Sequence, residues 1–146
     1  NPVPFIQRFM ASLISCIYSG YSLPGNMDPT LFSHDMDVIE DYITDPLVQS
    51  SINARCFSQI WKAIKKVHIL SPYVKTPCII FHGENDSLND IEASKKFFYS
   101  LGTSRKELYI VRGAYHEIFH EKGKDQLIEK LVDWLNLEKN IEIKET

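Results

Sequence analysis

Two short apolar runs in the second half of the chain predict neighbouring strands of one parallel sheet. The runs are CIIFH (78–82) and ELYIV (107–111), and a helical pattern follows each of them, over 89–101 and 123–136. A continuous apolar run of this length is typical of a strand that is covered on both faces. The region is therefore predicted to form a right-handed β-α-β-α unit. Two parallel strands do not make a stable sheet alone, so further strands are expected beside them.

The chain before residue 74 is predicted to be almost purely helical. Apolar residues recur at helical spacing over 5–18, and a short helix is expected over 36–43. The YSLPGN segment (21–26) is rich in turn-forming residues and is predicted to be a loop. An amphipathic helix is predicted over 52–70, because apolar residues gather on one face and lysines on the other. Its apolar face comprises Phe57, Ile60, Trp61, Ile64 and Val67.

The composition is that of an ordinary globular domain and excludes some partners. The chain has 146 residues, of which 44% are apolar and 24% charged. A net charge of −3 leaves no basic stripe to neutralise phosphates, so no nucleic-acid partner is expected. The three cysteines, Cys16, Cys56 and Cys78, lack C-x-x-C spacing. They are predicted to be small buried residues in a reducing compartment.

The first residues of the chain give an expectation about the cellular location of the protein. No signal peptide is visible at Asn1-Pro2, and the start without methionine leads us to expect further sequence upstream. The apolar stretch from Phe5 to Tyr18 is too short to span a bilayer. Its apolar stripe either packs on its neighbours or contacts lipid. These features favour a cytoplasmic or membrane-peripheral protein, and they do not indicate an oligomeric state.

Asp86 and His116 follow the two predicted strands and are the candidate catalytic residues. Asp86 ends HGEND (82–86), and His116 lies in GAYHE (113–117). Reactive groups of α/β sheets gather beyond the carboxyl ends of strands, and neighbouring strands lie only about 4.8 Å apart. The two side chains are therefore expected to come within hydrogen-bond distance. An acid that orients an imidazole base makes up two-thirds of a nucleophilic triad.

Three segments of the chain resemble the monoglyceride lipase and lysophospholipase branch of the α/β-hydrolases, which is serine aminopeptidase-like. The segments are LFSHDMDVIEDYITDPLV (31–48), TPCIIFHGENDSLND (76–90) and ELYIVRGAYHEIFHE (107–121). In that branch the H-G-x-x-D pattern supplies the triad acid, which matches Asp86. The G-A-Y-H pattern supplies the triad histidine, which matches His116. The 31–48 pattern belongs to a helical cap inserted before the penultimate strand.

The resemblance implies the C-terminal part of an α/β-hydrolase fold. It implies a helical cap or lid region over 1–74, the β-α-β-α portion of the core over 75–140, and a frayed tail over 141–146. It also implies a Ser-His-Asp hydrolase that needs no cofactor and cleaves carboxylic esters of lipid-like substrates. Peripheral contact with lipid through the cap is a further expectation.

The nucleophilic serine of such a triad is not found in the chain. No G-x-S-x-G turn occurs in the sequence, so the resemblance implies that the nucleophile lies upstream of Asn1. The chain alone is therefore expected to be inactive. Ser22 in GYSLPG (20–25) has proline where the second glycine belongs, and no buried strand is predicted before it. It is interpreted as a loop residue of the cap.

Two alternatives remain open. The protein could be a degenerate hydrolase or lipid-binding module that kept the fold and lost the nucleophile. Remotely, HEIFHEKG (116–123) could begin a zinc peptidase site, with His116 and His120 as ligands and Glu117 as base. That site needs both histidines on one long helix, whereas a strand is predicted just before His116. The expected third histidine is replaced by Gln126, so no metal is expected.

Other polar residues near the pair are assigned structural roles. His82 is interpreted as a hydrogen-bonded residue of the strand, and Asn89 as the first residue of a capping box for the next helix. Asp90 is the second-choice triad acid, but it is interpreted as a residue of the N-terminal turn of the next helix. His120 and Glu121 are expected in the turn that leads into the last helix, where Glu121 suits the N-terminal helix dipole.

Overall fold

The computed structural model describes residues 21–25, 27–49 and 51–145. The described residues divide into two compact units: a smaller one from 21–27 and 45–70, and a larger one from 28–44 and 71–145. The helix predicted over 5–18, and Cys16 within it, lie outside the described residues. The larger unit carries both candidate catalytic residues.

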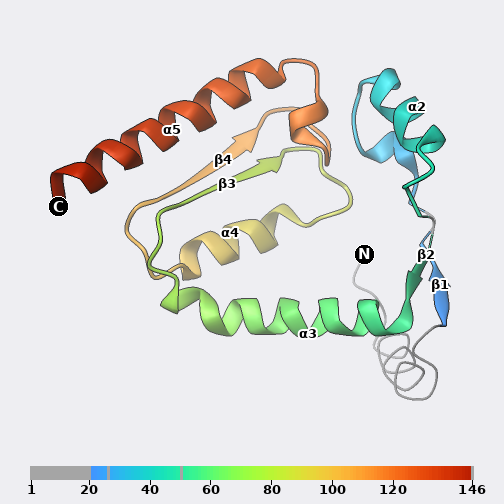
Figure 1. Ribbon diagram of the computed structural model, residues 1–146, viewed down its shortest axis with the longest axis horizontal. Helices are drawn as coiled ribbons and strands as arrows, with labels where there is room; N and C mark the ends of the chain where they lie inside the picture. Colours follow the sequence, from blue (N-terminus) through green and yellow to red (C-terminus); the bar gives the residue numbers. More distant parts are fainter. Residues whose placement is uncertain (1–20, 26, 50, 146) are drawn as a thin grey trace. The chain divides into compact units, whose positions relative to one another are not determined.

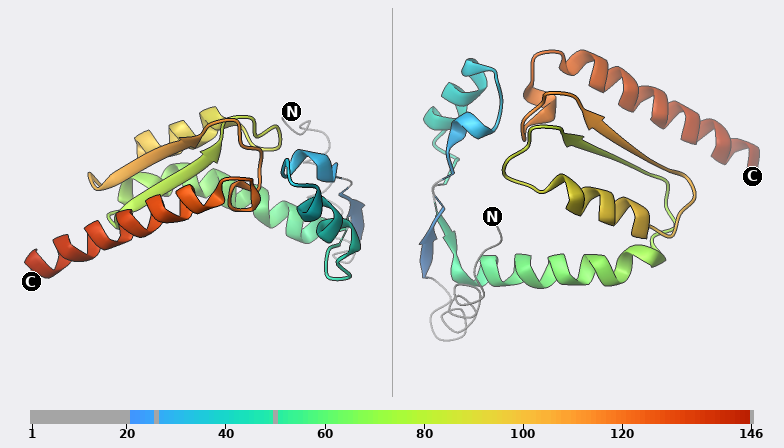
Figure 2. Two further views of the ribbon diagram at one scale, coloured as in Figure 1. Left: turned by 90° about the horizontal axis from the view of Figure 1, so that it is seen from above. Right: turned by 180° about the vertical axis from the view of Figure 1, so that it is seen from behind.

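The larger unit is built on a pair of parallel strands, β3 (Cys78–Gly83) and β4 (Lys106–Val111). Helix α4 (Ile91–Ser100) connects the strands, and helix α5 (Lys124–Glu145) follows β4. The two helices lie on opposite sides of the strand pair (Figures 1 and 2). The predicted β-α-β-α unit is therefore confirmed. A short 3-10 helix, η2 (Ser71–Tyr73), leads into β3.

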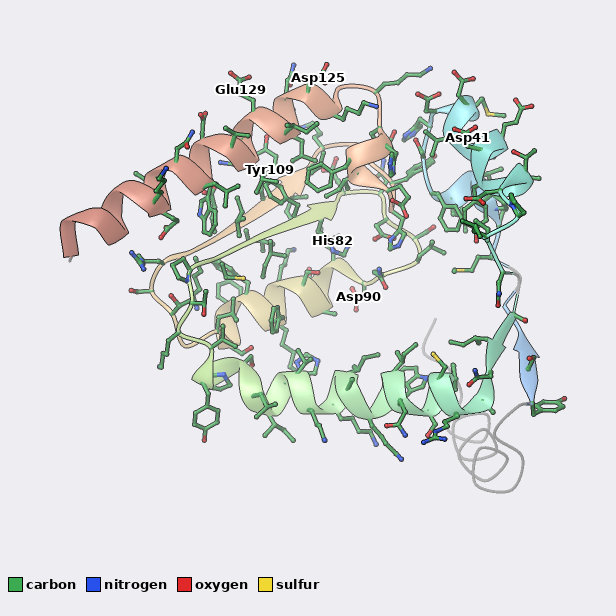
Figure 3. All side chains as sticks on the ribbon, viewed as in Figure 1. Asp41, His82, Asp90, Tyr109, Asp125 and Glu129 are labelled. Carbon is green, nitrogen blue, oxygen red and sulfur yellow. The ribbon has the colours of Figure 1, made fainter. Side chains whose placement is uncertain are left out.

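Side chains of the strand pair alternate between its two faces. Phe81 and Tyr109 are register partners with ring centroids 5.8 Å apart, and the Lys130 ammonium of α5 lies 4.9 Å from the Tyr109 centroid (Figure 3). The next residue, His82, has its Nδ1 2.8 Å from the Ser94 hydroxyl of α4. His82 is buried, as its structural interpretation requires. The alternation thus directs His82 toward the α4 side of the sheet.

The N-cap of helix α4 lies one residue later in the chain than predicted. Asp90 is the N-cap, and its carboxylate accepts a hydrogen bond from the Glu92 amide at 2.9 Å. The prediction that Asn89 caps this helix is wrong. The Asn89 amide instead donates to the Asp86 carboxylate at 3.0 Å, which places Asn89 in the loop before the helix.

Helix α5 is longer than predicted. It continues to Glu145, whereas the apolar pattern predicts a helix over 123–136 only, and the frayed tail over 141–146 stays a prediction. Most residues after Asn136 are good helix formers. Glu138 also forms an ion pair with Arg105, 3.4 Å apart, which attaches this part of the helix to the residue before β4. An apolar pattern alone underestimates a helix that is continued by charged residues.

Residues 28–44 belong to the same unit as the strands. They form the 3-10 helix η1 (Pro29–Leu31) and helix α2 (Met36–Thr44), which confirms the helix predicted over 36–43. Phe32 is buried and contacts Tyr42 edge to face, with centroids 4.5 Å apart. Part of the expected cap region, 1–74, therefore packs in the unit that contains β3 and β4. The role of the region as a cap stays a prediction.

The smaller unit combines a two-stranded antiparallel pair with a long helix. Strands β1 (Ser22–Pro24) and β2 (Ser51–Asn53) pair with each other, and helix α3 (Ala54–Leu70) follows β2 directly. Helix α3 confirms the helix predicted over 52–70. The prediction of a simple loop over 21–26 is wrong, because a three-residue strand is too short to give a recognisable alternation.

Several side chains of the smaller unit are more exposed than expected. Ile60, Ile64 and Val67, from the predicted apolar face of α3, are 42–45% exposed. Cys56, on the same helix, is exposed rather than buried, and Cys78 of β3 in the larger unit is half-buried. In the described parts of the chain, no helix is both long enough and apolar enough to cross a membrane.

Gly83 ends β3 in close contact with the loop that carries His116. A Cβ at Gly83 would lie 2.0 Å from the Tyr115 carbonyl oxygen and 2.6 Å from that of Ala114. Because both obstacles are backbone atoms, we expect Gly83→Ala to lower the free energy of unfolding by about 3 kcal/mol. Urea denaturation measures this loss.

Gly113→Ala is the matched control in the same pair of loops. Gly113 has a positive φ of 71°, but no atom lies within 4 Å of the point that a Cβ would occupy. Only backbone strain opposes this substitution, so we expect a loss of about 1 kcal/mol. Equal losses for the two variants would show that the contact between Gly83 and the His116 loop is not tight.

Candidate active site

The loops that follow β3 and β4 are joined by hydrogen bonds at the carboxyl ends of the strands. The Glu84 amide donates to the Val111 carbonyl, and the Asn85 amide to the Ala114 carbonyl, both at 2.9 Å. The Glu84 carboxylate accepts a bond from the Gly113 amide at 2.8 Å. Because the strands are parallel neighbours, both loops leave the sheet at the same edge. The two backbone bonds hold the loops side by side, and the exposed Glu84 carboxylate only adds to them.

Asp86 and His116 are brought together by these loops. The Nδ1 atom of His116 lies 2.9 Å from Oδ2 of Asp86. The Asp86 side chain is 4% exposed, and the His116 side chain is 31% exposed. The carboxylate is therefore enclosed, while the imidazole keeps access to solvent. The bond engages Nδ1, so Nε2 is the nitrogen with which His116 could act as a base.

The Asp86 carboxylate accepts hydrogen bonds on both oxygens. Oδ1 accepts from the Leu88 amide at 2.8 Å and from the Asn89 amide at 3.0 Å, while Oδ2 faces His116. Burial by itself raises the pKa of the Asp86 carboxyl, but the bonds from His116, Asn89 and Leu88 outweigh burial. The pKa therefore lies below its ordinary range, and Asp86 is charged at neutral pH.

His82 approaches the same carboxylate from β3. Its Nε2 lies 3.7 Å from Asp86 Oδ2 and, among the described residues, is buried without a hydrogen-bond partner. Its Nδ1 is 2.8 Å from the Ser94 hydroxyl. When that hydroxyl donates to Nδ1, the ring proton resides on Nε2 and points toward a negative charge. His82 thus supports Asp86 electrostatically from within the sheet.

Asn89, which was predicted to cap helix α4, is a neighbour of His116. Its side-chain amide lies 3.3 Å from His116 Nδ1, the atom that also faces Asp86. The atom of Asn89 that faces the ring is Nδ2, a donor, so when Nδ1 gives its proton to Asp86 the two groups are in contact without a second hydrogen bond. The three-residue spacing from Asp86 to Asn89 is the only signal that could have suggested this contact.

Glu121 is a second residue near the pair whose surroundings were not predicted. It lies three residues before α5 and is buried, with 7% exposure. Its predicted place in the turn that leads into α5 is confirmed, but its carboxylate serves another segment, because Oε1 accepts the Tyr115 amide at 2.8 Å. Tyr115 directly precedes His116. Glu121 is thus part of the structure that holds the loop.

Two other candidates from the sequence lie elsewhere. Ser22 is in β1, within an antiparallel strand pair of the other unit, and not at a turn from a strand into a helix. Asp90, the second-choice triad acid, caps α4. Neither residue has the position that a triad member would need.

The zinc alternative lacks the helix that it requires. His116 lies in a loop before the 3-10 helix η3 (Ile118–His120), so His116 and His120 do not share one α-helix. The Nδ1 of His120 instead lies 3.2 Å from the Glu117 carboxylate. Among the residues that the structure describes, no group of three or more His, Cys, Asp or Glu side chains could hold a metal ion.

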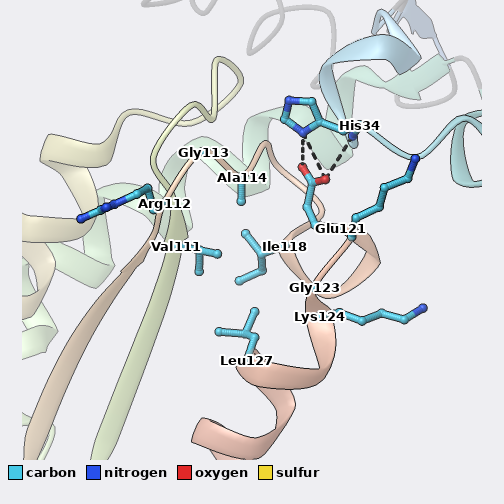
Figure 4. A pocket seen from close by; sticks show the side chains of 11 residues that line it. His34, Val111, Arg112, Gly113, Ala114, Ile118, Glu121, Gly123, Lys124 and Leu127 are labelled. Atoms are coloured by element: carbon cyan, nitrogen blue, oxygen red, sulfur yellow. Dashed lines mark hydrogen bonds and ion pairs between the residues drawn. The ribbon is translucent and has the colours of Figure 1, made fainter.

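A pocket of about 260 Å³ lies beside the site, between the end of β4, η3 and the start of α5 (Figure 4). Its lining is largely apolar, with Val111, Ile118 and Leu127 facing the space and Glu121 at its edge. Neither Asp86 nor His116 lines it. The pocket is therefore not the place where a substrate would meet the imidazole.

The Asp86 carboxylate also stabilises the fold. We expect Asp86→Asn to lower the free energy of unfolding at pH 7 by about 1–3 kcal/mol, because an amide cannot replace a charged acceptor. Since the folded-state pKa of Asp86 is lowered, this contribution is complete above the pKa of an unfolded aspartate. It is lost as the pH falls through the folded-state pKa, so the two proteins become more alike in acid. Urea denaturation between pH 7 and pH 3 measures the difference.

Asp90→Asn is the control for this measurement. Asp90 is also an aspartate that accepts a backbone hydrogen bond, but at an N-cap asparagine serves nearly as well. We expect a much smaller loss for this variant. A loss in Asp86→Asn that stayed constant down to pH 3 would contradict the stabilising role of the charged form.

Comparisons with known proteins show the family to which the chain belongs. Residues 1–123 match the model of the family described as serine aminopeptidase, S33. The chain is 31% identical over 138 residues to a monoglyceride lipase homolog of Monkeypox virus, a match that covers 92% of this chain and 49% of that protein.

Two solved structures are similar over most of the chain. The monoacylglycerol lipase of Paleococcus ferrophilus has a TM-score of 0.85 and 28% identity, over 91% of this chain and 52% of that one. A soluble variant of monoglyceride lipase from Saccharomyces cerevisiae, in complex with a substrate analog, has a TM-score of 0.71 and 23% identity, over 90% of this chain and 49% of that one. The chain thus spans about half the length of these relatives. The resemblance to this branch of the α/β-hydrolases, and the fold that it implies, are confirmed.

Proposed function

Since the chain belongs to the serine aminopeptidase S33 family of α/β-hydrolases, we propose that the whole protein is a serine hydrolase that cleaves carboxylic esters of lipid-like substrates. We expect its activity to be that of a monoacylglycerol lipase, a lysophospholipase or a carboxylesterase. The hydrogen bond of 2.9 Å between Asp86 and His116, at the carboxyl edge of two parallel strands, carries this proposal.

In the proposed mechanism His116 acts first as a base and then as an acid. Its Nε2 takes the proton of a serine hydroxyl while the serine oxygen attacks the ester carbonyl carbon. The same proton then passes to the departing alcohol oxygen, which leaves an acyl-enzyme. Water repeats the sequence and releases the acid. Asp86 holds the proton of the neutral ring on Nδ1 and stabilises the imidazolium that forms. This chemistry needs no cofactor.

The proposal assigns the nucleophile to sequence before Asn1. The chain contains no G-x-S-x-G pattern, and the proposed serine would occupy the family's turn between a strand and a helix. The 146-residue chain alone is therefore proposed to lack triad-dependent esterase activity.

The substrate class is proposed from the relatives. One is named as a monoglyceride lipase homolog, one as a monoacylglycerol lipase, and one was solved with a substrate analog. These names support an ester with a lipid-like acyl chain. Contact of the cap region with a lipid surface is a further part of this proposal.

Removal of the imidazole tests the role of His116. In the protein that includes the residues before Asn1, we expect His116→Ala to lower kcat/KM for a monoacylglycerol by about 100- to 10,000-fold, because the general base is lost. His120→Ala is the matched control, since His120 is exposed and pairs only locally with Glu117. This control is expected to keep kcat/KM close to that of the wild type.

Labelling with a serine-directed fluorophosphonate complements the kinetic measurement. Wild type and His120→Ala should be labelled rapidly, and His116→Ala slowly. A protein that is neither labelled nor active on any ester would favour the alternative of a non-catalytic hydrolase or lipid-binding module. Equal losses in the two histidine variants would contradict the assignment of His116.

Replacement of the acid tests the tautomer of the ring. In Asp86→Asn the amide oxygen can stay on the Leu88 and Asn89 amides only if its NH2 group faces His116 Nδ1. A donor at that place moves the ring proton to Nε2, where it blocks proton acceptance. We expect kcat to fall by about 10,000-fold with little change in KM. A variant that is folded and retains the kcat of the wild type would rule out Asp86 as the triad acid.

A further inference from the structure

Glu121 is a buried carboxylate that the proposed chemistry does not use. Its Oε1 accepts the Tyr115 amide at 2.8 Å and lies 3.0 Å from Nδ1 of His34. Its Oε2 accepts the His34 amide at 3.1 Å and lies 3.4 Å from the Ser33 hydroxyl. Figure 4 shows the paired carboxylate and His34 ring at the edge of the pocket. The donors come from two segments far apart in sequence, residues 33–34 and the loop after β4.

Residues 32–34 also hold the other side of His116. The Phe32 carbonyl accepts a hydrogen bond from the Glu117 amide at 2.8 Å. The Phe32 ring is buried, with its centroid 6.3 Å from that of the His116 ring. His34 stacks on Tyr115, with centroids 3.7 Å apart and an angle of 28° between the rings. Both neighbours of His116 are therefore anchored to a segment that begins more than eighty residues earlier.

The charge of Glu121 strengthens this anchor. Burial by itself raises the pKa of the Glu121 carboxyl. The hydrogen bonds from the Tyr115 amide and from the ring and amide of His34 outweigh burial, so the pKa lies below its ordinary range. The group is therefore a carboxylate at neutral pH, and its hydrogen bonds are of the stronger, charge-assisted kind. Removing it would leave several donors without their acceptor.

From this geometry we infer that Glu121 is a positioning residue for His116, which ties the loop of the imidazole to residues 32–34. The inference rests on the proposed role of His116 as the base. Asp86 determines the rotation and tautomer of the ring through Nδ1. Glu121 and Phe32 determine where the backbone that carries the ring lies. A base needs both, because proton transfer to Nε2 depends on the distance to the serine hydroxyl.

Two substitutions of Glu121 test the inference in the protein that includes the residues before Asn1. Glu121→Ala removes all acceptors. Glu121→Gln keeps the volume and one oxygen, but its NH2 group faces the donors of His34 or Tyr115. We expect kcat to fall about 100-fold in the alanine variant and about 10-fold in the glutamine variant, because the base is displaced. KM should change little, since Glu121 does not line the proposed reaction centre.

Glu84→Gln is the matched control. Glu84 is a carboxylate that accepts an amide of the same loop, that of Gly113 at 2.8 Å, but it is exposed and holds a residue farther from His116. This variant is expected to keep the kcat of the wild type. If every hydrogen bond of the loop mattered equally, kcat would fall as much in Glu84→Gln as in Glu121→Gln. That result would overturn a specific role for Glu121.

A second measurement does not depend on ester hydrolysis. In the proton NMR spectrum, the His116 Nδ1 proton that is bonded to Asp86 should give a resonance far downfield. We expect both Glu121 variants to shift or broaden this resonance, and to raise the exchange rate of the Tyr115 amide about 10-fold. Glu84→Gln should leave both signals unchanged.

The outcomes separate the inference from the proposed function. A protein that hydrolyses no ester contradicts the proposed function, while the His116 resonance still decides whether Glu121 positions the ring. An unchanged resonance and an unchanged kcat in a folded Glu121→Gln would overturn the inference. Should the alanine variant fail to fold, the glutamine variant, which keeps the shape of the side chain, decides the question alone.

Discussion

The parallel pairing of β3 with β4 is the constraint on which the site depends. Gly83 lies opposite Val111, so both strands end at the same level and release their loops at one edge of the sheet. Backbone bonds from Glu84 and Asn85 then join the two loops. The close approach of Gly83 to the Tyr115 carbonyl leaves no room for a side chain between them. A shift in this register would separate the carboxylate from the imidazole, although both residues would still follow strands.

Two enclosed carboxylates share the work of placing His116. Asp86 and Glu121 are both buried, and burial alone would favour their neutral forms. Each stays charged because backbone amides and an imidazole donate to it. Asp86 contacts the ring itself, through Nδ1, whereas Glu121 accepts a hydrogen bond from the amide of the preceding residue, Tyr115. A buried, charged carboxylate thus constrains the rotation of the ring in the case of Asp86, and the position of the backbone in the case of Glu121.

A helical segment from the first third of the chain also takes part in this arrangement. Residues 28–44 are grouped with the strands, and Phe32, Ser33 and His34 contact the loop that carries His116. The expected division into a cap before residue 74 and a core after it follows the order of the sequence. The observed packing instead groups this short stretch with the loops that follow β3 and β4. The chain spans about half of its relatives, so the activity of the whole protein rests on the proposed mechanism.

The sequence by itself determined the β-α-β-α unit, helices α2 and α3, and the meeting of Asp86 with His116, because apolar periodicity and the position after a strand are local properties. Only the tertiary structure decided the roles of Asn89 and Glu121, which looked like ordinary residues at the starts of helices. The donors around Glu121 include residues 87 positions away in the chain. A local pattern predicts a helix or a strand, but the partners of a buried charge depend on which distant segments fold against it.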